Sequence, residues 1–235
     1  MPRLATYIIP ESSTKLYQIG SAILGWDVIA ERAVPLPKEL QAIGSELELW
    51  RGPAGKFGFH ATIGDALDYA AEMVPEIEVR LERIARSTHP FELSNGRVHT
   101  SFRAVPRCLA ATFDSPGQAV NQLEERVVTE VNVLHESSPW FGDFQDRFTP
   151  LQLAQFRGFG SPNVRSLFDL HFTLASEIPD ANTWRLLKDL VRCGAGFLES
   201  EDQRAMTVDR IFLLEEGEDG QYRVRRSFVL TGGVG

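Results

Sequence analysis

The sequence predicts an α+β fold, in which antiparallel strands joined by tight turns alternate with helices. Short apolar segments bounded by Gly- and Pro-containing turns are typical of strands, and longer segments between them carry apolar residues at helical spacing. Several of these strands follow one another directly along the chain. That order favours an antiparallel sheet with helices beside it over the parallel sheet of a Rossmann fold.

The first half of the chain predicts four strands and two helices. Pro35 and Pro37 interrupt the chain before a helical or irregular stretch that runs to residue 49. Residues 69–86 have apolar side chains at the spacing of an amphipathic helix. The expected elements are a strand at 5–9, a helix at about 13–24, a strand at 57–63, a helix at 69–86, and strands at 91–98 and 109–113 that we expect to pair as a hairpin.

The second half predicts three helices, a second strand with a histidine, and a final hairpin. Pro residues mark the entry to two of the helices, and glycines close the third. No low-complexity segment or long linker divides the chain, so we expect one domain, 1–235, with two lobes. The expected elements are helices at 115–134, 149–156 and 180–192, a strand around residue 171, and a hairpin of strands 206–214 and 222–230.

Composition excludes several classes of function. The chain has 235 residues, 43% of them hydrophobic, and a formal net charge of −8. Duplex DNA binding draws its affinity from neutralised phosphates, so we expect no duplex DNA partner, although a small phosphate or an RNA end stays possible. No stretch approaches the roughly 20 apolar residues of a membrane helix, and the N-terminus lacks a secretory pattern. We therefore expect a cytoplasmic protein with no membrane partner; its oligomeric state is not predicted.

A weak internal repeat carries the functional signal. Each half of the chain contains the pattern aromatic, any residue, apolar, His, any residue, Thr, aliphatic, and the two histidines lie 111 residues apart. On a strand, residues two apart project from the same face, so each copy presents an imidazole and a hydroxyl together. The copies are Phe57-Gly58-Phe59-His60-Ala61-Thr62-Ile63 and Phe168-Asp169-Leu170-His171-Phe172-Thr173-Leu174.

Two such motifs facing each other suit the opening of a cyclic phosphodiester. One neutral imidazole can activate water on one side of phosphorus, and one protonated imidazole can protonate the departing alkoxide on the other. The hydroxyls of Thr62 and Thr173 can donate to the non-bridging oxygens. We therefore predict His60 and His171 as catalytic residues, with no metal and no cofactor. Cys108 and Cys193 lack metal-ligand spacing and are interpreted as reduced thiols.

These motifs resemble the pair of H-x-[ST] motifs of the two-histidine (2H) phosphoesterase superfamily. The similarity extends over nearly the whole chain to a bacterial branch assigned to phosphonate metabolism. Besides the first motif, which resembles that branch's "YGFHATL", three other segments carry it. They are Ala5-Thr6-Tyr7-Ile8-Ile9-Pro10, Gly20-Ser21-Ala22-Ile23-Leu24-Gly25 and Phe159-Gly160-Ser161-Pro162-Asn163-Val164.

The resemblance implies two pseudo-symmetric lobes of antiparallel sheet, with outer helices, around a V-shaped cleft. It also implies a cyclic phosphodiesterase that acts on a ribose cyclic phosphate from phosphonate breakdown, a 2′,3′-cyclic nucleotide or an RNA end. His60 and His171 would be catalytic, Thr62 and Thr173 would bind phosphate, and which histidine is the base stays open. Tyr7 is a further candidate that could line the cleft or pack in the core.

Three basic positions of that branch are neutral or acidic in this chain. Gly64-Asp65 follows the first motif where the branch commonly has a lysine, and residues 169–177 lack the branch's two arginines. The substrate would then carry less charge, or other arginines would supply the charge. The alternative function is a catalytically silent nucleotide- or phosphate-binding module. Candidate arginines are Arg103 and Arg107, as substrate-binding residues, and also Arg157 and Arg165.

Overall fold

The computed structural model describes residues 1–99, 108–139 and 142–233, and its centre is one eight-stranded antiparallel sheet. The strand order is β10-β9-β1-β4-β7-β6-β5-β8, with a separate two-stranded hairpin of β2 and β3. The strands are β1 (Arg3–Ile8), β2 (Trp26–Asp27), β3 (Arg32–Ala33), β4 (Ala61–Asp68), β5 (Phe91–His99), β6 (Leu109–Asp114), β7 (Phe172–Ala175), β8 (Met206–Val208), β9 (Arg210–Glu216) and β10 (Tyr222–Val229).

The sheet consists of two halves that meet at its middle. The first half contains β10, β9, β1 and β4, and the second contains β7, β6, β5 and β8. Within the described part of the chain, Ala61 with Phe172 is the one register pair that joins β4 to β7. The sheet also curls, because β8 pairs with β5 at one edge and continues through a single residue into β9, which pairs with β1. The predicted α+β class, with two antiparallel halves and outer helices, is confirmed.

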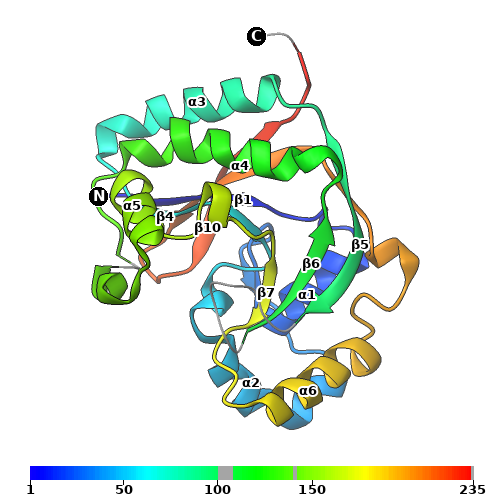
Figure 1. The fold of residues 1–235 in the computed structure, drawn as a ribbon. Helices are drawn as coiled ribbons and strands as arrows, with labels where there is room; N and C mark the ends of the chain where they lie inside the picture. The colour runs from blue at the N-terminus through cyan, green and yellow to red at the C-terminus, as the bar shows by residue number, and fades with distance from the viewer. Residues whose placement is uncertain (100–107, 140–141, 234–235) are drawn as a thin grey trace.

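Helices cover the two halves separately (Figure 1). α3 packs against β9 and β10, and α4 packs against β4, so this pair covers the first half. α1 and α2 contact β7 in the second half, and α6 leads into residues 190–194, which contact residues 38–43 just before α2. The helices are α1 (Lys15–Leu24), α2 (Gly44–Arg51), α3 (Val74–Arg86), α4 (Ala119–Glu130), α5 (Pro150–Phe159) and α6 (Ala181–Asp189).

Local sequence explains where the helices begin and end. Thr149 caps α5 through a capping box with Gln152, and the Asp180 carboxylate accepts from the first amides of α6. α1 ends at Gly25, whose φ of 81° is a conformation that glycine adopts without steric cost. In α3 the buried side chains recur at helical spacing, which directs one face of the helix onto the sheet.

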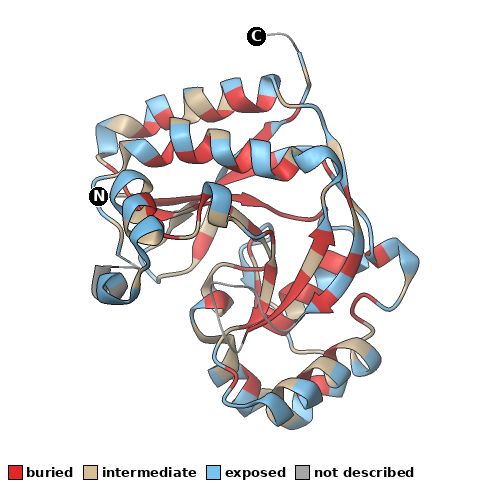
Figure 2. Ribbon diagram, in the orientation of Figure 1, coloured by how far each residue is buried: buried red, intermediate tan, exposed pale blue. Residues whose placement is uncertain are grey.

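The core occupies the helix-facing side of the sheet (Figure 2). Phe59, Phe172 and Phe113 meet there. The ring centroid of Phe172 lies 5.3 Å from that of Phe59 and 5.5 Å from that of Phe113. Gly20 of α1 lies directly on this cluster, since a Cβ at that position would stand 2.4 Å from the Phe59 ring. The small side chain therefore lets α1 approach the strand junction closely.

Two predicted strand boundaries were wrong. The strand expected at 57–63 begins only at Ala61 and runs on to Asp68, because Gly58 turns the chain with a φ of 72°. The strand expected at 206–214 is two strands: β8 is an edge strand paired with β5, whereas β9 lies near the opposite edge, between β10 and β1. Among the described residues, no helix is long and apolar enough to span a membrane.

Candidate functional site

The two His-x-Thr motifs lie at the junction of the two halves of the sheet. His60 and His171 each stand one residue before their strand, β4 and β7. Ala61 and Phe172 are fully buried and point to the helix-covered face, so the histidines and threonines project to the other face. The Ala61–Phe172 pair sets the register. That register brings His60 opposite Thr173, and Thr62 opposite His171.

This arrangement brings the two imidazoles onto one patch of surface. Diagonal neighbours on antiparallel strands have Cα atoms roughly 7–8 Å apart, which is within the reach of two side chains to one phosphate group. The predicted partners Thr62 and Thr173 form the other diagonal of the same square. Histidines and threonines from both halves of the chain therefore converge, as the internal repeat predicted.

Each imidazole is held by its own strand in the same way. His60 Nδ1 lies 2.8 Å from the carbonyl oxygen of Gly58, and His171 Nδ1 lies 2.7 Å from that of Asp169. A carbonyl only accepts, so we assign the hydrogen of both rings to Nδ1. Proton exchange with a bound group then falls to Nε2 in both residues. Gly58 is required at its position, because a Cβ there would lie 2.8 Å from Val28 Cβ.

Two aromatic residues pack against the His60 ring and hold its orientation. The Tyr7 ring stacks on it with centroids 3.7 Å apart and planes 17° apart, and Phe57 lies 5.8 Å away. Tyr7 is 2% exposed. The sequence left open whether Tyr7 lines the cleft or packs in the core; Tyr7 pairs with Thr62, so it lies on the face of the motifs, where it is buried against His60. Lys56, next to Phe57, bonds Glu216 of β9 at 3.0 Å and so ties this loop to the sheet.

Burial lowers the pKa of both histidines. Desolvation is the main cause that lowers the pKa of His60 from 6.5 to about 4; the hydrogen bond to the Gly58 carbonyl opposes it, and the charge of the nearby His171 adds to it. Desolvation also lowers the pKa of His171, but the Asp169 carbonyl and the Asp169 charge both raise it. His60 is therefore the imidazole that is more strongly held neutral.

Thr173 has a second neighbour that the sequence did not predict. The buried Cys108, just before β6, contacts the Thr173 hydroxyl, and burial raises the pKa of its thiol to about 12. The thiol is thus a neutral, unreactive group at neutral pH. The interpretation of Cys108 as a reduced thiol fits this environment, and Cys193 is also a free thiol, at the surface.

The predicted arginines do not complete the site in the described residues. Arg103 and Arg107 lie outside the residues that the structure describes. Arg157 is exposed on α5, and Arg165 pairs with Glu125 of α4 at 3.0 Å. Asp65 belongs to the Gly64-Asp65 segment where the resemblance expected a lysine; it is buried beside Ser161, and burial raises the pKa of its carboxyl. Substrate contacts by these arginines stay predictions.

Residues on β5 and β6 share the His171 face, and sequence reasoning missed them. Ala111 pairs with Phe172, so Thr112 is the next residue along on the side of His171, and Thr112 in turn pairs with Arg97. A hollow of about 460 Å³ lies there; it is lined by Arg97, His99, Thr112, Phe113, Asp114, Ser115, Val120, Asn121, Phe168, Asp169 and Leu170. The Asn95-Gly96 pair inside a strand was the available signal, because it is typical of a bulge.

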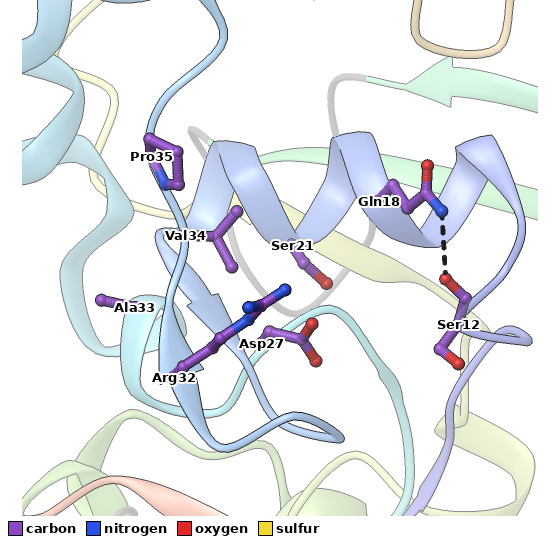
Figure 3. Close-up of a pocket in the computed structure, with 8 residues that line it drawn as sticks. All are labelled: Ser12, Gln18, Ser21, Asp27, Arg32, Ala33, Val34 and Pro35. Carbon is purple, nitrogen blue, oxygen red and sulfur yellow. Dashed lines mark hydrogen bonds between the residues drawn. The ribbon is translucent and has the colours of Figure 1, made fainter.

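A second hollow, of about 400 Å³, lies between α1 and the β2–β3 hairpin (Figure 3). Asp27 and Arg32, which are cross-strand partners in the hairpin, lie side by side in it, and Gln18 donates to the Ser12 carbonyl at its rim. The Asp27 carboxylate accepts from the Tyr17 hydroxyl and from two amides of its own loop. These bonds give it a structural role. Within the described residues, no group of three or more His, Cys, Asp or Glu side chains is placed to hold a metal ion.

Comparison with known proteins gives the family. Residues 68–223, about two thirds of the chain, match the family described as "Protein of unknown function (DUF1045)". The chain belongs to the DUF1045 family. The matched region of this DUF1045 member contains His171 but begins after His60. The chain is also 28% identical over 183 residues to the ribose 1,5-bisphosphate phosphokinase PhnN of Laribacter hongkongensis (strain HLHK9). That similarity covers 77% of this chain and 41% of PhnN, so the chain spans about two fifths of its relative's length.

Solved structures share the fold of this DUF1045 member. TT0787 of Thermus thermophilus is 16% identical, a phosphoesterase is 18% identical, and Escherichia coli LigT complexed with 3′-AMP is 14% identical. Each has a TM-score of 0.50, and the similarity covers 98% of this chain and 98–99% of the other. These are 2H phosphoesterase folds, so the resemblance predicted from the motifs is confirmed at the level of the fold.

Proposed function

We propose that this chain is a phosphoesterase that opens a small cyclic phosphodiester, with His60 and His171 as its acid–base pair. The observation that carries the proposal is the Ala61–Phe172 register, which sets the two His-x-Thr motifs side by side on the face of the sheet opposite these two buried side chains. Each imidazole also has its Nδ1 bonded to a backbone carbonyl. Two pre-oriented imidazoles with two hydroxyls between them match what an in-line displacement at phosphorus requires.

The reaction divides between the four side chains. One imidazole takes a proton from water through Nε2 as the water oxygen attacks phosphorus. The other gives a proton to the ring oxygen as its bond to phosphorus breaks, so the product is a phosphomonoester with a free hydroxyl. Thr62 and Thr173 donate to the non-bridging oxygens, whose charge grows in the transition state. These groups supply base, acid and charge stabilisation, so we propose a reaction that needs no metal.

We assign the base to His60 and the acid to His171. A base must be neutral before the reaction, and burial with Tyr7 stacked on the ring holds the pKa of His60 at about 4. An acid must be protonated, and Asp169 favours the protonated form of His171 through its carbonyl and its charge. A bound phosphate anion adds a further charge that favours protonation of the imidazole. The difference between the two environments supports opposite roles for the pair.

The names and ligands of two related proteins are the basis on which we propose a substrate class. The name of the PhnN relative refers to a ribose bisphosphate, and the LigT structure contains 3′-AMP. Both are small phosphorylated ribose compounds. We propose a ribose cyclic phosphate from phosphonate breakdown or a 2′,3′-cyclic nucleotide or RNA end as the substrate.

A specific observation favours a second candidate, a binding module without turnover. Gly64-Asp65 on β4 replaces the lysine that the resemblance expects after the first motif, and the Asp65 carboxyl is buried beside Ser161. A carboxyl so close to the motifs gives a phosphate no attraction. Under this alternative, the fold would hold a nucleotide between the motifs but release no product.

Hydrolysis of a panel of cyclic phosphates in the presence of EDTA tests the proposal. The panel contains 2′,3′-cyclic nucleotides and ribose 1,2-cyclic 5-phosphate. We expect turnover that His60→Asn or His171→Asn lowers by at least about a thousandfold, since each removes an acid or a base. His135→Asn is the matched control, because His135 also bonds a backbone carbonyl through Nδ1, at 2.7 Å, but belongs to neither motif. Binding without turnover of any panel member would favour the binding module.

A further inference from the structure

The hollow beside His171 lies on the same sheet face as the proposed phosphate position. Thr112, Asp114 and Arg97 project into it from β6 and β5, and Asp169 and Leu170 lead directly from it to His171. Its volume of about 460 Å³ is in the range of small-molecule sites. A substrate with its phosphate between the two motifs would therefore extend the rest of the molecule into this space.

A bulge in β5 aims Arg97 into the hollow. Ser94 pairs with Asp114 but Arg97 pairs with Thr112, so one extra residue lies on β5 between these pairs. Asn95 has a φ of 53°, and a Cβ on Gly96 would stand 2.5 Å from the Phe113 ring. Without the extra residue, Arg97 would fall on the core face of the strand. The sequence Asn95-Gly96 thus permits a local geometry that serves this face of the sheet.

Thr112 carries an unused hydrogen-bonding group. Its Oγ1 is buried and has no hydrogen-bond partner in the described part of the chain. Removing a hydroxyl from water without a partner is unfavourable, and such groups need a reason to be kept. Thr112 lines the hollow, and a rotation of its side chain would turn Oγ1 toward a ligand hydroxyl there, which could both donate to Oγ1 and accept from it.

Arg97, Asp114 and Asp169 together leave the lining of the hollow one unit negative, which does not favour a second phosphate. Arg97 is paired with Asp114 at 2.9 Å, and the other Asp114 oxygen accepts from Asn95 at 2.9 Å. Asp169 adds a further carboxylate to the lining. The amide of Val120, in the first turn of α4, donates to Ser115 Oγ at 3.2 Å and is not left for an anion. A lining with both donors and acceptors and no excess of positive charge suits neutral hydroxyl groups.

We propose that this hollow is the subsite for the sugar of the substrate, a neutral and hydroxyl-bearing group attached to the phosphate between the motifs. The assignment rests on the proposed position of that phosphate. Thr112 is its central contact, Arg97 and Asp114 offer a donor and an acceptor to ring hydroxyls, and Phe168 offers an apolar side. The subsite selects sugar phosphates over phosphates of simple alcohols.

Calorimetric titration of the full chain with three ligands tests this assignment. The ligands are 3′-AMP, methyl phosphate, which lacks a sugar, and adenosine 3′,5′-bisphosphate, which carries a second charge. We expect 3′-AMP to bind more tightly than methyl phosphate. Thr112→Val should weaken 3′-AMP binding about tenfold and change methyl phosphate binding less than about twofold. Thr207→Val, on an exposed position of β8, is the matched control and should change neither.

Thermal unfolding shows that any loss is not structural. Thr112→Val removes a buried hydroxyl that has no partner among the described residues, so we expect the variant's Tm to equal or exceed that of the wild type. A subsite that is used for binding therefore gives weaker binding in a protein at least as stable.

Three results would overturn the subsite. The first is that Thr112→Val changes the affinities for 3′-AMP and methyl phosphate equally, or changes neither. The second is that the wild type binds neither ligand. The third is that the bisphosphate binds more than about tenfold tighter than 3′-AMP and Arg97→Gln removes the gain. Turnover is measured separately: selective loss of 3′-AMP binding without hydrolysis keeps the subsite and rejects the enzyme, whereas normal hydrolysis by Thr112→Val keeps the enzyme and rejects the subsite.

Discussion

Ala61 and Phe172 form the register pair that joins the two halves of the sheet. Both side chains are fully buried on the helix-covered face. Their neighbours along each strand, His60 with Thr62 and His171 with Thr173, must therefore face the other way. One backbone pairing in the core thus determines that the two motifs share a surface.

The threonines are expected to act on the charge of the transition state. Thr62→Val or Thr173→Val removes one donor to a non-bridging oxygen and should lower kcat by roughly a hundredfold. Thr62→Ser and Thr173→Ser keep the hydroxyl and should retain most of the activity. Steady-state kinetics on a cyclic phosphate checks this, and valine variants with kcat within about twofold of wild type would exclude the role.

Tyr7 is expected to set the protonation of His60. Its ring covers the imidazole at 3.7 Å, so Tyr7→Leu admits water and should raise the pKa of His60 from about 4 toward 6.5. As the pH falls, His60 then becomes protonated, and stops acting as a base, at a higher pH than in the wild type. The acidic limb of the kcat/KM profile should therefore move up by roughly one to two pH units, about as much as the pKa of His60. Tyr7→Phe keeps the ring and should leave the limb in place. An unmoved limb in Tyr7→Leu would show that His60 is not the group that limits the rate at low pH.

Glu124 predicts a pH dependence of stability. Burial, with Asp65 and Glu125 nearby, raises the pKa of its carboxyl from 4.5 to about 7, against the opposing effect of the Arg165 amide and charge. The folded protein then binds more protons than the unfolded chain between about pH 4.5 and 7. This contribution is present at low pH and is lost as pH rises through that window.

Glu124→Gln removes that dependence. The free energy of unfolding of the variant, relative to wild type, should rise by about 3 kcal/mol between pH 4.5 and pH 7. Urea denaturation at several pH values measures the difference. Glu125→Gln is the control on the same helix, because Glu125 is 53% exposed and its pair with Arg165 is worth little. A flat difference for Glu124→Gln would contradict a neutral buried carboxyl.

Gly96 predicts a steric effect at the β5 bulge. An alanine Cβ would lie 2.5 Å from Phe113 Cε1 and 3.0 Å from Arg204 Cα, so Gly96→Ala should destabilise the protein by about 1–3 kcal/mol. A Cβ added at Gly158, inside α5, would have no neighbouring heavy atom within 4 Å. Gly158→Ala should therefore stabilise the protein by up to about 1 kcal/mol. Equal effects of the two substitutions would show that the bulge is not tightly packed.

The sequence predicted the fold class and the convergence of the motifs for a physical reason. Hydrophobic periodicity and turn residues are local signals, and they located nearly every strand and helix. The His-x-Thr repeat added a long-range signal, since each half of the chain carries one copy. The single-domain organisation stays a prediction.

The remaining features depend on pairings that no local pattern reveals. The boundary at Ala61 follows from the turn at Gly58, which must avoid Val28, a residue about 30 positions away. Residues 206–216 form two strands, β8 paired with β5 and β9 paired with β1, because the sheet curls and brings its two ends together. Thr112 and Arg97 reach the face of His171 only through the register of three strands and one bulge. Such residues become visible once the pairing is known.

The most direct measurement of the central claim is a double-mutant cycle on His60 and His171. We would compare kcat/KM of His60→Asn, His171→Asn and the double variant on a cyclic phosphate that the wild type opens. If both imidazoles act on one phosphate in one step, the double variant should be about as slow as the slower single variant, because removing either one already abolishes the concerted reaction. Losses that multiply, or a single variant with wild-type activity, would show that the two motifs do not work together.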